Sequence, residues 1–371
     1  MVLIKMLRKK KLAALVVLLL LQEPITRAKK RFWVKDWLLQ RDTLSHMALV
    51  RKLRTSATND LNNYLRMDMC FNEDLKFSAV ISPQALGRII PDTCQCIYKV
   101  LKKKYLKFPD TVEEWQKIAR DYNSRWNFPN WGVAIDGKHI KIVKPVNSGS
   151  YYFNYKEYFS TVLMAIVDAN YEFIYVNVGC NGRISDGAVI ETTKLYDKLL
   201  EKALKLPSNE TTINKMNFVF VADDAFALNE NILKPFPDRN LSKEQRIFNY
   251  RLSRARRTVE NAFGILSNRF RVFQTAIHMK PEKVDKTVLA AVVLHNFLRR
   301  HTNNYIPKNY VDFEVLDTGD VVKGDWRNGM MLDSVQPILN RHSSHEAKEN
   351  RKMYKNYFSG FGTVPWQENF S

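Results

Sequence analysis

The sequence predicts an α/β fold for residues 126–300, in which several strands and helices share one sheet. Three short β-rich runs lie between turn residues: WGVAIDGKHIKIV (131–143), STVLMAIVDAN (160–170) and YEFIYVNVGC (171–180). The fully apolar run in NFVFVADDAF (217–226) is bounded by polar segments, as is typical of a central strand covered on both faces. Helical patterns occur near 187–205 and after Ser242. Strands and helices in one stretch of the chain indicate an α/β domain rather than an all-β one.

A long helix is predicted after Ser242, because Gln245 follows it at capping-box spacing. In RIFNYRLSRARRTVENAFGILSNRF (246–270), a spacing of 100° per residue gives a core stripe of Ala255, Val259, Phe263, Leu266 and Phe270. A second face carries Ser253, Arg256, Glu260, Gly264, Ser267 and Arg271. The small residues on that face allow close approach, and its arginines suit phosphate.

The chain before the strands reads as helical. Ser82-Pro83 is typical of a helix start, Pro91 is expected to begin a second helix, and Thr111 begins a third with Glu114 in a capping box. We therefore divide the chain into a basic and aromatic segment (1–54), a small helical domain (55–128), the α/β domain (129–300) and a polar tail (301–371). The tail is expected to be mostly extended, with some ordered contact near its end.

The charge predicts a polyanionic partner. Lysine and arginine number 58 against 38 acids, a net charge of +20. Nucleic acid is the first candidate for that partner and an anionic membrane the second. Phe32, Trp33 and Trp37 lie among the basic residues of 1–54, which suits either a base-stacking arm or a solvated charged run with an aromatic anchor.

The N-terminal apolar run, Leu12–Leu21, is too short to span a bilayer as a helix. It fits either a signal peptide or a buried or dimer-forming helix between basic, nuclear-import-like clusters, and we favour the second. The four cysteines are too few and scattered for a disulfide scaffold, which predicts reduced thiols in an intracellular protein without a membrane partner.

Three acids stand out by their positions. Asp136 lies within the first strand, Asp223 ends the apolar strand, and Glu260 lies on the long helix. Carboxylates from separate elements suit Mg²⁺ or Mn²⁺, which prefer oxygen ligands. Each acid also has a structural alternative: Glu260 as an i,i+4 partner of Arg256, Asp223 as a helix cap, and Asp136 as a cap of the turn at Gly137. His139 is a further candidate, although a strand histidine is more often structural. The sequence has no Gly-rich phosphate loop and no GxSxG motif.

The motifs GVAIDGKHI, VDANYEFIYVNVGCNGRISDGAV, FVADDAF and NYRLSRARRTVENAFGILSNRF together resemble PIF/Harbinger transposases and the nucleases derived from them. The resemblance covers residues 126–300 and extends to short pieces near both ends: RFWVKDWLLQRD (31–42), NYLRMD (63–68) and YFSGFGTVPWQ (357–367). It implies an RNase H-like mixed sheet with flanking helices and a DDE triad that binds a divalent metal cation.

Carried over onto this chain, the resemblance places the triad on Asp136, Asp223 and Glu260, both as catalytic residues and as metal ligands. It places supporting roles on Asp168, Asp186 and His139, and phosphate or DNA contacts on Arg256, Arg271, Arg254 and Lys138. It also implies a Myb-like DNA-binding partner and a nuclear location, with the cytoplasm and self-association left open.

Two departures from the family pattern are expected to matter. Ser185 stands where the family usually has histidine, and the helical domain is shortened between NYLRMD and AVISPQALGRIIPDTC. The function predicted from the sequence is a metal-dependent DNA endonuclease; the alternative is a domesticated, non-catalytic DNA- or chromatin-binding protein.

Overall fold

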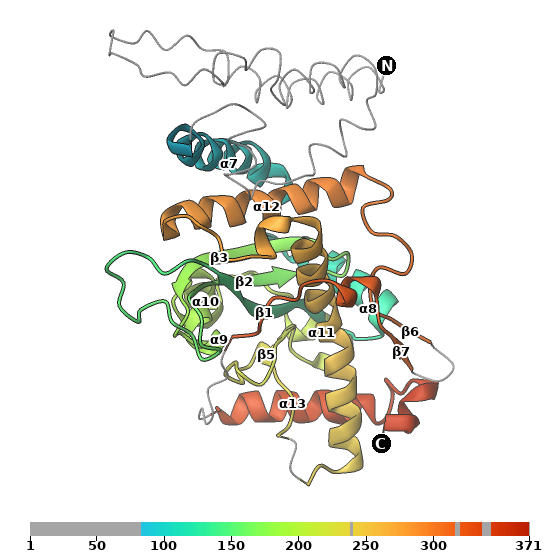
Figure 1. Ribbon diagram of the computed structural model, residues 1–371. Helices are drawn as coiled ribbons and strands as arrows, with labels where there is room; N and C mark the ends of the chain where they lie inside the picture. Colours follow the sequence, from blue (N-terminus) through green and yellow to red (C-terminus); the bar gives the residue numbers. More distant parts are fainter. Residues whose placement is uncertain (1–82, 238–239, 316–319, 336–342, 371) are drawn as a thin grey trace, which may run out of the picture. The chain divides into compact units, whose positions relative to one another are not determined.

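The computed structural model describes residues 83–370 apart from 238–239, 316–319 and 336–342 (Figure 1). The predictions made for residues 1–82, including the apolar run and the basic aromatic segment, lie outside these residues. The chain divides into two compact units, and the larger unit, which includes residues 94–371, contains the sheet and all the predicted site residues.

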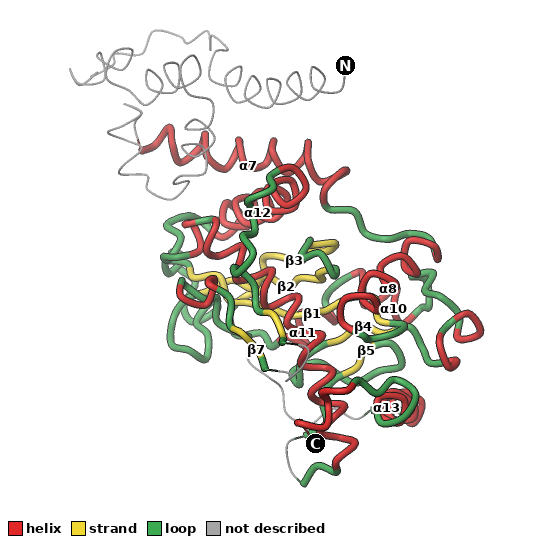
Figure 2. Tube along the Cα trace, turned by 90° about the vertical axis from the view of Figure 1, so that its right-hand side faces the viewer, coloured by secondary structure: helices red, strands yellow, loops and turns green. Residues whose placement is uncertain are grey.

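A five-stranded mixed sheet forms the centre of the larger unit. Its strands are β1 (Trp131–Lys141), β2 (Ser160–Val167), β3 (Phe173–Asn181), β4 (Val219–Val221) and β5 (Ile232–Leu233). They lie in the order β3-β2-β1-β4-β5, which Figure 2 shows from top to bottom. β1, β2 and β3 pair antiparallel, whereas β4 joins β1 and β5 joins β4 in parallel. This mixed α/β arrangement is consistent with the RNase H-like fold that the family resemblance implies.

The remaining described elements are α-helices, short 3₁₀ helices and a two-stranded sheet. The α-helices are α7 (Pro83–Tyr105), α8 (Val112–Trp126), α9 (Asp186–Glu191), α10 (Lys194–Leu200), α11 (Lys243–Arg269), α12 (Pro281–His301) and α13 (His345–Phe358). Short 3₁₀ helices are η1 (Asn209–Thr211), η2 (Ile213–Lys215), η3 (Arg271–Phe273), η4 (Asp325–Asn328) and η5 (Pro365–Phe370), and β6 (Phe313–Glu314) pairs with β7 (Val321–Val322).

Both faces of the sheet are buried, because alternate strand residues point to opposite sides. On one side, Ala134 and Val221 pack with residues of α11, α12 and α13. On the other side, Val133 and Phe220 pack with residues of α9 and α10. The apolar run at 217–226 is thus covered on both faces, as its composition predicts.

The local signals in the sequence place most of these elements correctly. Ser242 and Gln245 form a complete capping box at the start of α11, and the Thr111 side chain accepts a hydrogen bond from the Glu114 backbone N–H at the start of α8. The prediction that Pro91 begins a new helix is wrong, because Pro91 lies inside α7. Proline removes one backbone hydrogen bond, and here the helix continues past that loss.

Residues 301–371 contain more structure than the expected extended tail. Tyr354 and Phe358 of α13 are fully buried and belong to the same hydrophobic cluster as α11. Trp326 of η4 is buried against Gly264, whose missing side chain makes room for the indole ring. The four-part division of the chain stays a prediction, but α8 and α13 belong to the same compact unit as the sheet.

Two further expectations concern the parts of the chain that the structure describes. Cys94, Cys96 and Cys180 form no disulfide among the residues that the structure describes, and their redox state stays a prediction. Within the same residues, no helix is both long enough and apolar enough to cross a bilayer.

Candidate active site

The parallel pairing of β1 with β4 brings two aspartates together. Ala134 is paired with Val221 across the two strands. Asp136 follows Ala134 by two positions on β1, and Asp223 lies two residues beyond the end of β4, close enough for the charge of Asp136 to act on it. The face of β1 that carries Ala134 and Asp136 is the one covered by α11.

Asp136 is completely buried, and a cation accompanies it. The Lys138 ammonium lies 2.9 Å from Asp136 Oδ2, and the Gly137 backbone N–H donates to Oδ1 at 2.8 Å. β1 continues through Gly137, so the turn that the structural alternative expected Asp136 to cap does not form there. Asp136 Oδ2 accepts no hydrogen bond in the structure, so one buried oxygen of this carboxylate relies on the Lys138 charge alone.

Asp223 is held by a local backbone contact and lies under the influence of Asp136. Its Oδ1 accepts from the Ala225 N–H at 2.9 Å, and its Oδ2 lies 4.0 Å from Arg256 Nη2. Burial, followed by the negative charge of Asp136, raises the pKa of the Asp223 carboxyl to about 6. The neighbouring Asp224 is instead exposed and pairs with Lys234 at 3.0 Å, so Asp223 is the acid that faces Asp136.

Glu260, the third predicted acid, lies between two arginines. Its Oε1 is 3.6 Å from Arg256 on the same helix, which is the i,i+4 pairing that the structural alternative foresaw, and its Oε2 is 3.5 Å from Arg327. Arg256 therefore contacts both Asp223 and Glu260. The three acids surround a common place, but the side chain of Arg256 separates Glu260 from the aspartate pair.

This arrangement bears on the expected divalent cation. Among residues 83–370, apart from the gaps, no three acidic, histidine or cysteine side chains lie close enough to bind a metal ion together. The aspartate pair nevertheless fits such an ion, because two neighbouring carboxylates of low exposure repel each other and Asp136 has an oxygen without a hydrogen-bond donor. Lys138 and Arg256 supply the positive charge at this place in the structure.

His139 lies close to Asp136 in sequence but faces the other way. His139 is three positions after Asp136 on β1. Because successive side chains of a strand point to opposite faces, the side chains of Asp136 and His139 leave opposite faces of the sheet. Its Nδ1 is 2.9 Å from the Ser160 hydroxyl, and burial lowers the pKa of the imidazole to about 4. His139 is a neutral, buried histidine on the side of the sheet away from the aspartates.

The other two acids predicted to support the site are at turns. Asp168 Oδ1 accepts backbone hydrogen bonds from Asn170 and Glu172, at 2.8 and 2.9 Å, and so closes the turn between β2 and β3. Asp186 is the first residue of α9, and its side chain is outside the described part of the structure. Ser185, the departure from the family pattern, caps α9 by accepting from the Ala188 N–H.

The basic residues predicted to contact DNA fall into two groups. Arg271 is exposed and Arg256 partly exposed. Lys138 and Arg254 are buried: Lys138 accompanies Asp136, and Arg254 pairs with the buried Glu314 and donates to the Trp126 carbonyl at 2.8 Å. The guanidinium of Arg254 is thus engaged inside the fold, where a DNA phosphate does not reach it.

The small residues of α11 are also covered by the chain itself. Gly264 lies under the Trp326 indole, and the Ser267 hydroxyl donates to the Met330 carbonyl at 2.9 Å. The sequence predicts a face open to close approach, and the approaching segment is residues 326–330 of this chain.

The sequence analysis missed two contributors to the site. Arg327 pairs with Glu260 and with Asp312, and Ser334 accepts a hydrogen bond from the Lys138 ammonium at 2.7 Å. Both come from the polar tail, where no periodic pattern pointed to them. They became visible only when the fold brought residues 327 and 334 to α11 and β1.

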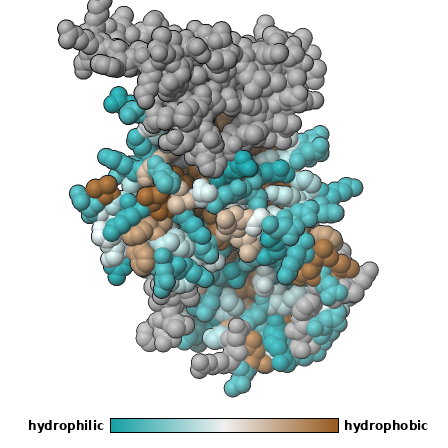
Figure 3. All heavy atoms as spheres, viewed as in Figure 1, coloured by the Kyte–Doolittle hydropathy of each residue, from teal (hydrophilic) through white to brown (hydrophobic). Residues whose placement is uncertain are grey.

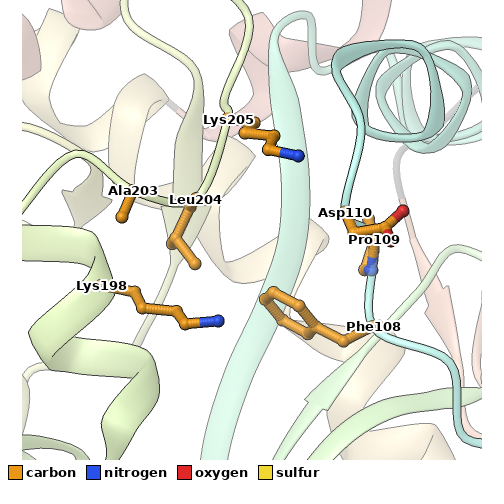
Figure 4. A pocket seen from close by; sticks show the side chains of 7 residues that line it. All are labelled: Phe108, Pro109, Asp110, Lys198, Ala203, Leu204 and Lys205. Carbon is orange, nitrogen blue, oxygen red and sulfur yellow. The ribbon is translucent and has the colours of Figure 1, made fainter.

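A separate pocket of about 160 Å³ contains none of the predicted site residues (Figure 4). Its lining residues are Phe108, Pro109, Asp110, Lys198, Ala203, Leu204 and Lys205. It lies beside α10, whose residues pack on the sheet face away from the aspartate pair, so we assign it no part in the candidate site.

The mixed sheet carries Asp136 on β1, with Asp223 just beyond β4 and Glu260 on the long helix α11. Residues 135–296 match the family described as DDE superfamily endonuclease, so the chain carries a domain of this family. The matched range starts one residue before Asp136 and includes Asp223 and Glu260.

The chain is homologous to curated proteins derived from Harbinger transposases. It is 28% identical over 202 residues to "Protein ALP1-like" of Arabidopsis thaliana, an alignment that covers 52% of this chain and 48% of the relative. It is 22% and 23% identical over 224 residues to "Putative nuclease HARBI1" of Homo sapiens and Mus musculus, with 60% of each chain covered. The chain thus spans between about half and 60% of the length of these relatives. No solved structure matches it significantly.

Proposed function

We propose that this chain is a metal-dependent DNA endonuclease that cleaves phosphodiester bonds with Asp136, Asp223 and Glu260. The observation that carries the proposal is the pair formed by Asp136, buried on β1, and the partly buried Asp223 just beyond β4, because two neighbouring carboxylates of low exposure require a cation. The DDE superfamily match and the printed name "Putative nuclease" of the relatives support the same reaction.

Asp136 and Asp223 would hold a Mg²⁺ or Mn²⁺ ion, and Glu260 would join them when Arg256 releases it. When bound, such an ion supplies a nucleophilic water and stabilises the leaving oxygen of a phosphodiester. The residues of the chain bind and orient the substrate: the partly exposed Arg256 lies between Asp223 and Glu260, where its guanidinium can pair with a phosphate instead of the carboxylates. The exposed Arg271, at the end of α11, is a second phosphate contact.

DNA as the substrate agrees with the net charge of +20 and would place the protein in the nucleus. The Myb-like partner and self-association remain predictions from the family resemblance.

The test is cleavage of supercoiled plasmid by the full chain with Mg²⁺, with Mn²⁺ and with EDTA. Asp136→Asn and Glu260→Gln should each abolish nicking while DNA binding in EDTA remains. Asp224→Asn is the matched control, because Asp224 is the exposed neighbour of Asp223 and pairs only with a surface lysine among the contacts given above. Nicking that persists in Asp136→Asn would refute the assignment of this site.

A second function is favoured by one specific observation. Lys138 and Arg256 already neutralise the aspartate pair, and no three metal-binding side chains come together in the described ranges. A chain that keeps these internal pairs would bind DNA or chromatin without cutting it. Three results together would support this function over the first. The wild type would bind DNA, it would not nick plasmid with Mg²⁺ or with Mn²⁺, and its melting temperature would not change in Mn²⁺.

A further inference from the structure

We propose that the loop between β1 and β2, residues 144–159, is a stacking surface for unpaired bases of DNA next to the candidate active site. The inference rests on the proposed function in taking DNA as the ligand, and it adds which form of DNA the chain recognises and with which residues. The loop joins β1 to its antiparallel neighbour β2 (Figure 1).

Exposed aromatic side chains are concentrated in this loop. Tyr151 is 56% exposed, Tyr155 42% and Phe153 39%, and Val146 at the beginning of the loop is 91% exposed. Single exposed apolar residues are normal on a protein surface, but three aromatic rings within five residues are a cluster that indicates binding. Aromatic rings are also the groups on which successive bases of a single strand stack.

Lysines accompany the rings. Lys156 lies 5.5 Å from the centre of the Tyr155 ring, Lys144 5.5 Å from that of Phe159, and Lys141 4.7 Å from that of Tyr158. Between residues 141 and 159 the sequence has three lysines and one acid, Glu157. The excess of lysines over acids beside the rings is the charge complementarity that favours a nucleic acid over an uncharged apolar partner.

The loop is held in a defined shape without a ligand. Asn154 accepts from the backbone N–H groups of Lys156 and Tyr158, at 3.0 and 3.2 Å, and donates to the Ser160 hydroxyl at 2.9 Å. Phe153 and Phe159 form an isolated bridge, with their rings edge to face at 5.2 Å. A preformed loop loses little conformational entropy when it binds, which favours a recognition role.

The base of the loop is connected to Asp136 by direct contacts. The Tyr155 hydroxyl donates to the Ser334 carbonyl at 2.9 Å, and the Ser334 hydroxyl accepts from Lys138, which pairs with Asp136. The Tyr155 ring also lies 5.9 Å from the ring of His139, which faces away from the aspartates, so a strand stacked on Tyr155 would be connected to the aspartate pair through Ser334 and Lys138. Unpaired bases at this place would arise where a duplex opens around the bond to be cut.

The face in view in Figure 3 does not suggest a protein partner for the loop instead. Figure 3 shows a mainly hydrophilic surface over the described residues, with small separate brown areas rather than one broad apolar face on the side in view. A stable protein interface needs a contiguous patch of about 800 Å² on each partner. We therefore commit to DNA, and leave self-association as an outcome of the test.

The experiment measures binding of labelled 20-nucleotide single strands and of the matching duplex to the full chain in EDTA, by fluorescence anisotropy. Tyr151→Ala should weaken single-strand binding about 5- to 150-fold, the range for loss of one base-stacking ring, and change duplex binding less than twofold. Tyr151→Trp should keep wild-type affinity. Phe361→Ala is the matched control, because Phe361 is a 97% exposed aromatic residue outside the loop, after α13.

A second measurement uses a strand with 2-aminopurine, whose fluorescence should be quenched by the wild type and Tyr151→Trp but not by Tyr151→Ala. Equal affinities of the wild type and Tyr151→Ala for the single strand would overturn the inference. It would also be overturned if Tyr151→Ala changed the particle mass measured by light scattering but left DNA binding unchanged, because the loop would then be a self-association surface. Binding is measured without metal, so it does not depend on nuclease activity. If single-strand binding requires Tyr151 but the wild type never nicks plasmid, only the nuclease proposal is refuted. Nicking with loop-independent binding would refute only this inference.

Discussion

Lys138→Met tests whether Lys138 is the internal counter-ion of the aspartate pair. The Lys138 ammonium and Asp136 Oδ2 are 2.9 Å apart, and the side chains are only 11% and 1% exposed. At an effective dielectric constant of 20, two unit charges at this distance attract by about 6 kcal/mol. Desolvation offsets part of this attraction, and removing one partner of a buried pair lowers stability by about 3–5 kcal/mol. The melting temperature of the metal-free protein should then fall by roughly 6–20 °C.

The assay for Lys138→Met is thermal unfolding in EDTA and in a series of Mn²⁺ concentrations. A bound cation replaces the lost ammonium, so Mn²⁺ should raise the melting temperature of Lys138→Met more than that of the wild type. Lys141→Met is the matched control: Lys141 is on the same strand, but its pair with Asp333 spans 3.7 Å and is about one third exposed on each side. Surface pairs of this kind contribute about 0–1 kcal/mol.

Two results would refute this reasoning. If Lys138→Met is as stable as Lys141→Met in EDTA, the buried pair does not stabilise the fold. If Mn²⁺ shifts Lys138→Met and wild type equally, the ion does not take the place of the ammonium.

Two other predictions concern packing and pH. Gly264→Ala places a Cβ 2.1 Å from the Trp326 ring, so it should lower the free energy of unfolding by about 1–3 kcal/mol and change the tryptophan fluorescence. Gly87→Ala is the control: nothing lies within 4 Å of its Cβ, so it should stabilise its helix by up to about 1 kcal/mol. Equal effects of the two substitutions on stability would contradict the packing of Trp326 on Gly264. His295 is fully buried, with burial lowering its pKa from 6.5 to about 4. Because the unfolded chain binds the proton more tightly, about 3 kcal/mol of stability present above pH 6.5 should be lost as the pH falls toward 4. His295→Gln, whose amide can still donate to the Tyr171 carbonyl, should flatten this part of the urea-unfolding profile, and an unchanged profile would refute it.

The central sheet and α11 could be predicted because their signals are local. β-Branched and aromatic residues fill the buried strands, and the capping box at Ser242 marks the first turn of α11 without help from distant residues. The aspartate pair could be predicted for a related reason. An acid at the end of an apolar run, as at Asp223, is costly to bury, so the run itself indicates that a cation lies nearby.

The contributions of residues 301–371 could not be predicted, because they depend on contacts between distant parts of the sequence. Trp326 is a single large residue in a polar stretch, and its place is determined by Gly264, 62 positions earlier. Glu314 pairs with Arg254 and Arg257 in the same way. No periodicity within the tail encodes such contacts, since each element is anchored by one or two side chains rather than by a repeated apolar face.

The same reasoning explains which basic residues should contact DNA. Lys138 and Arg254 were selected for their place near the acids, and that closeness is the reason they are engaged as counter-ions inside the fold. A phosphate competes poorly for a buried ammonium that already has a carboxylate, because its release would leave that carboxylate without a cation. Arg271 and the loop lysine Lys156 are exposed, so a phosphate can approach their charged groups from the solvent. The positive surface that binds DNA should therefore be sought at the rim of the aspartate pair, in the β1–β2 loop and at the end of α11, rather than among the cations closest to the carboxylates.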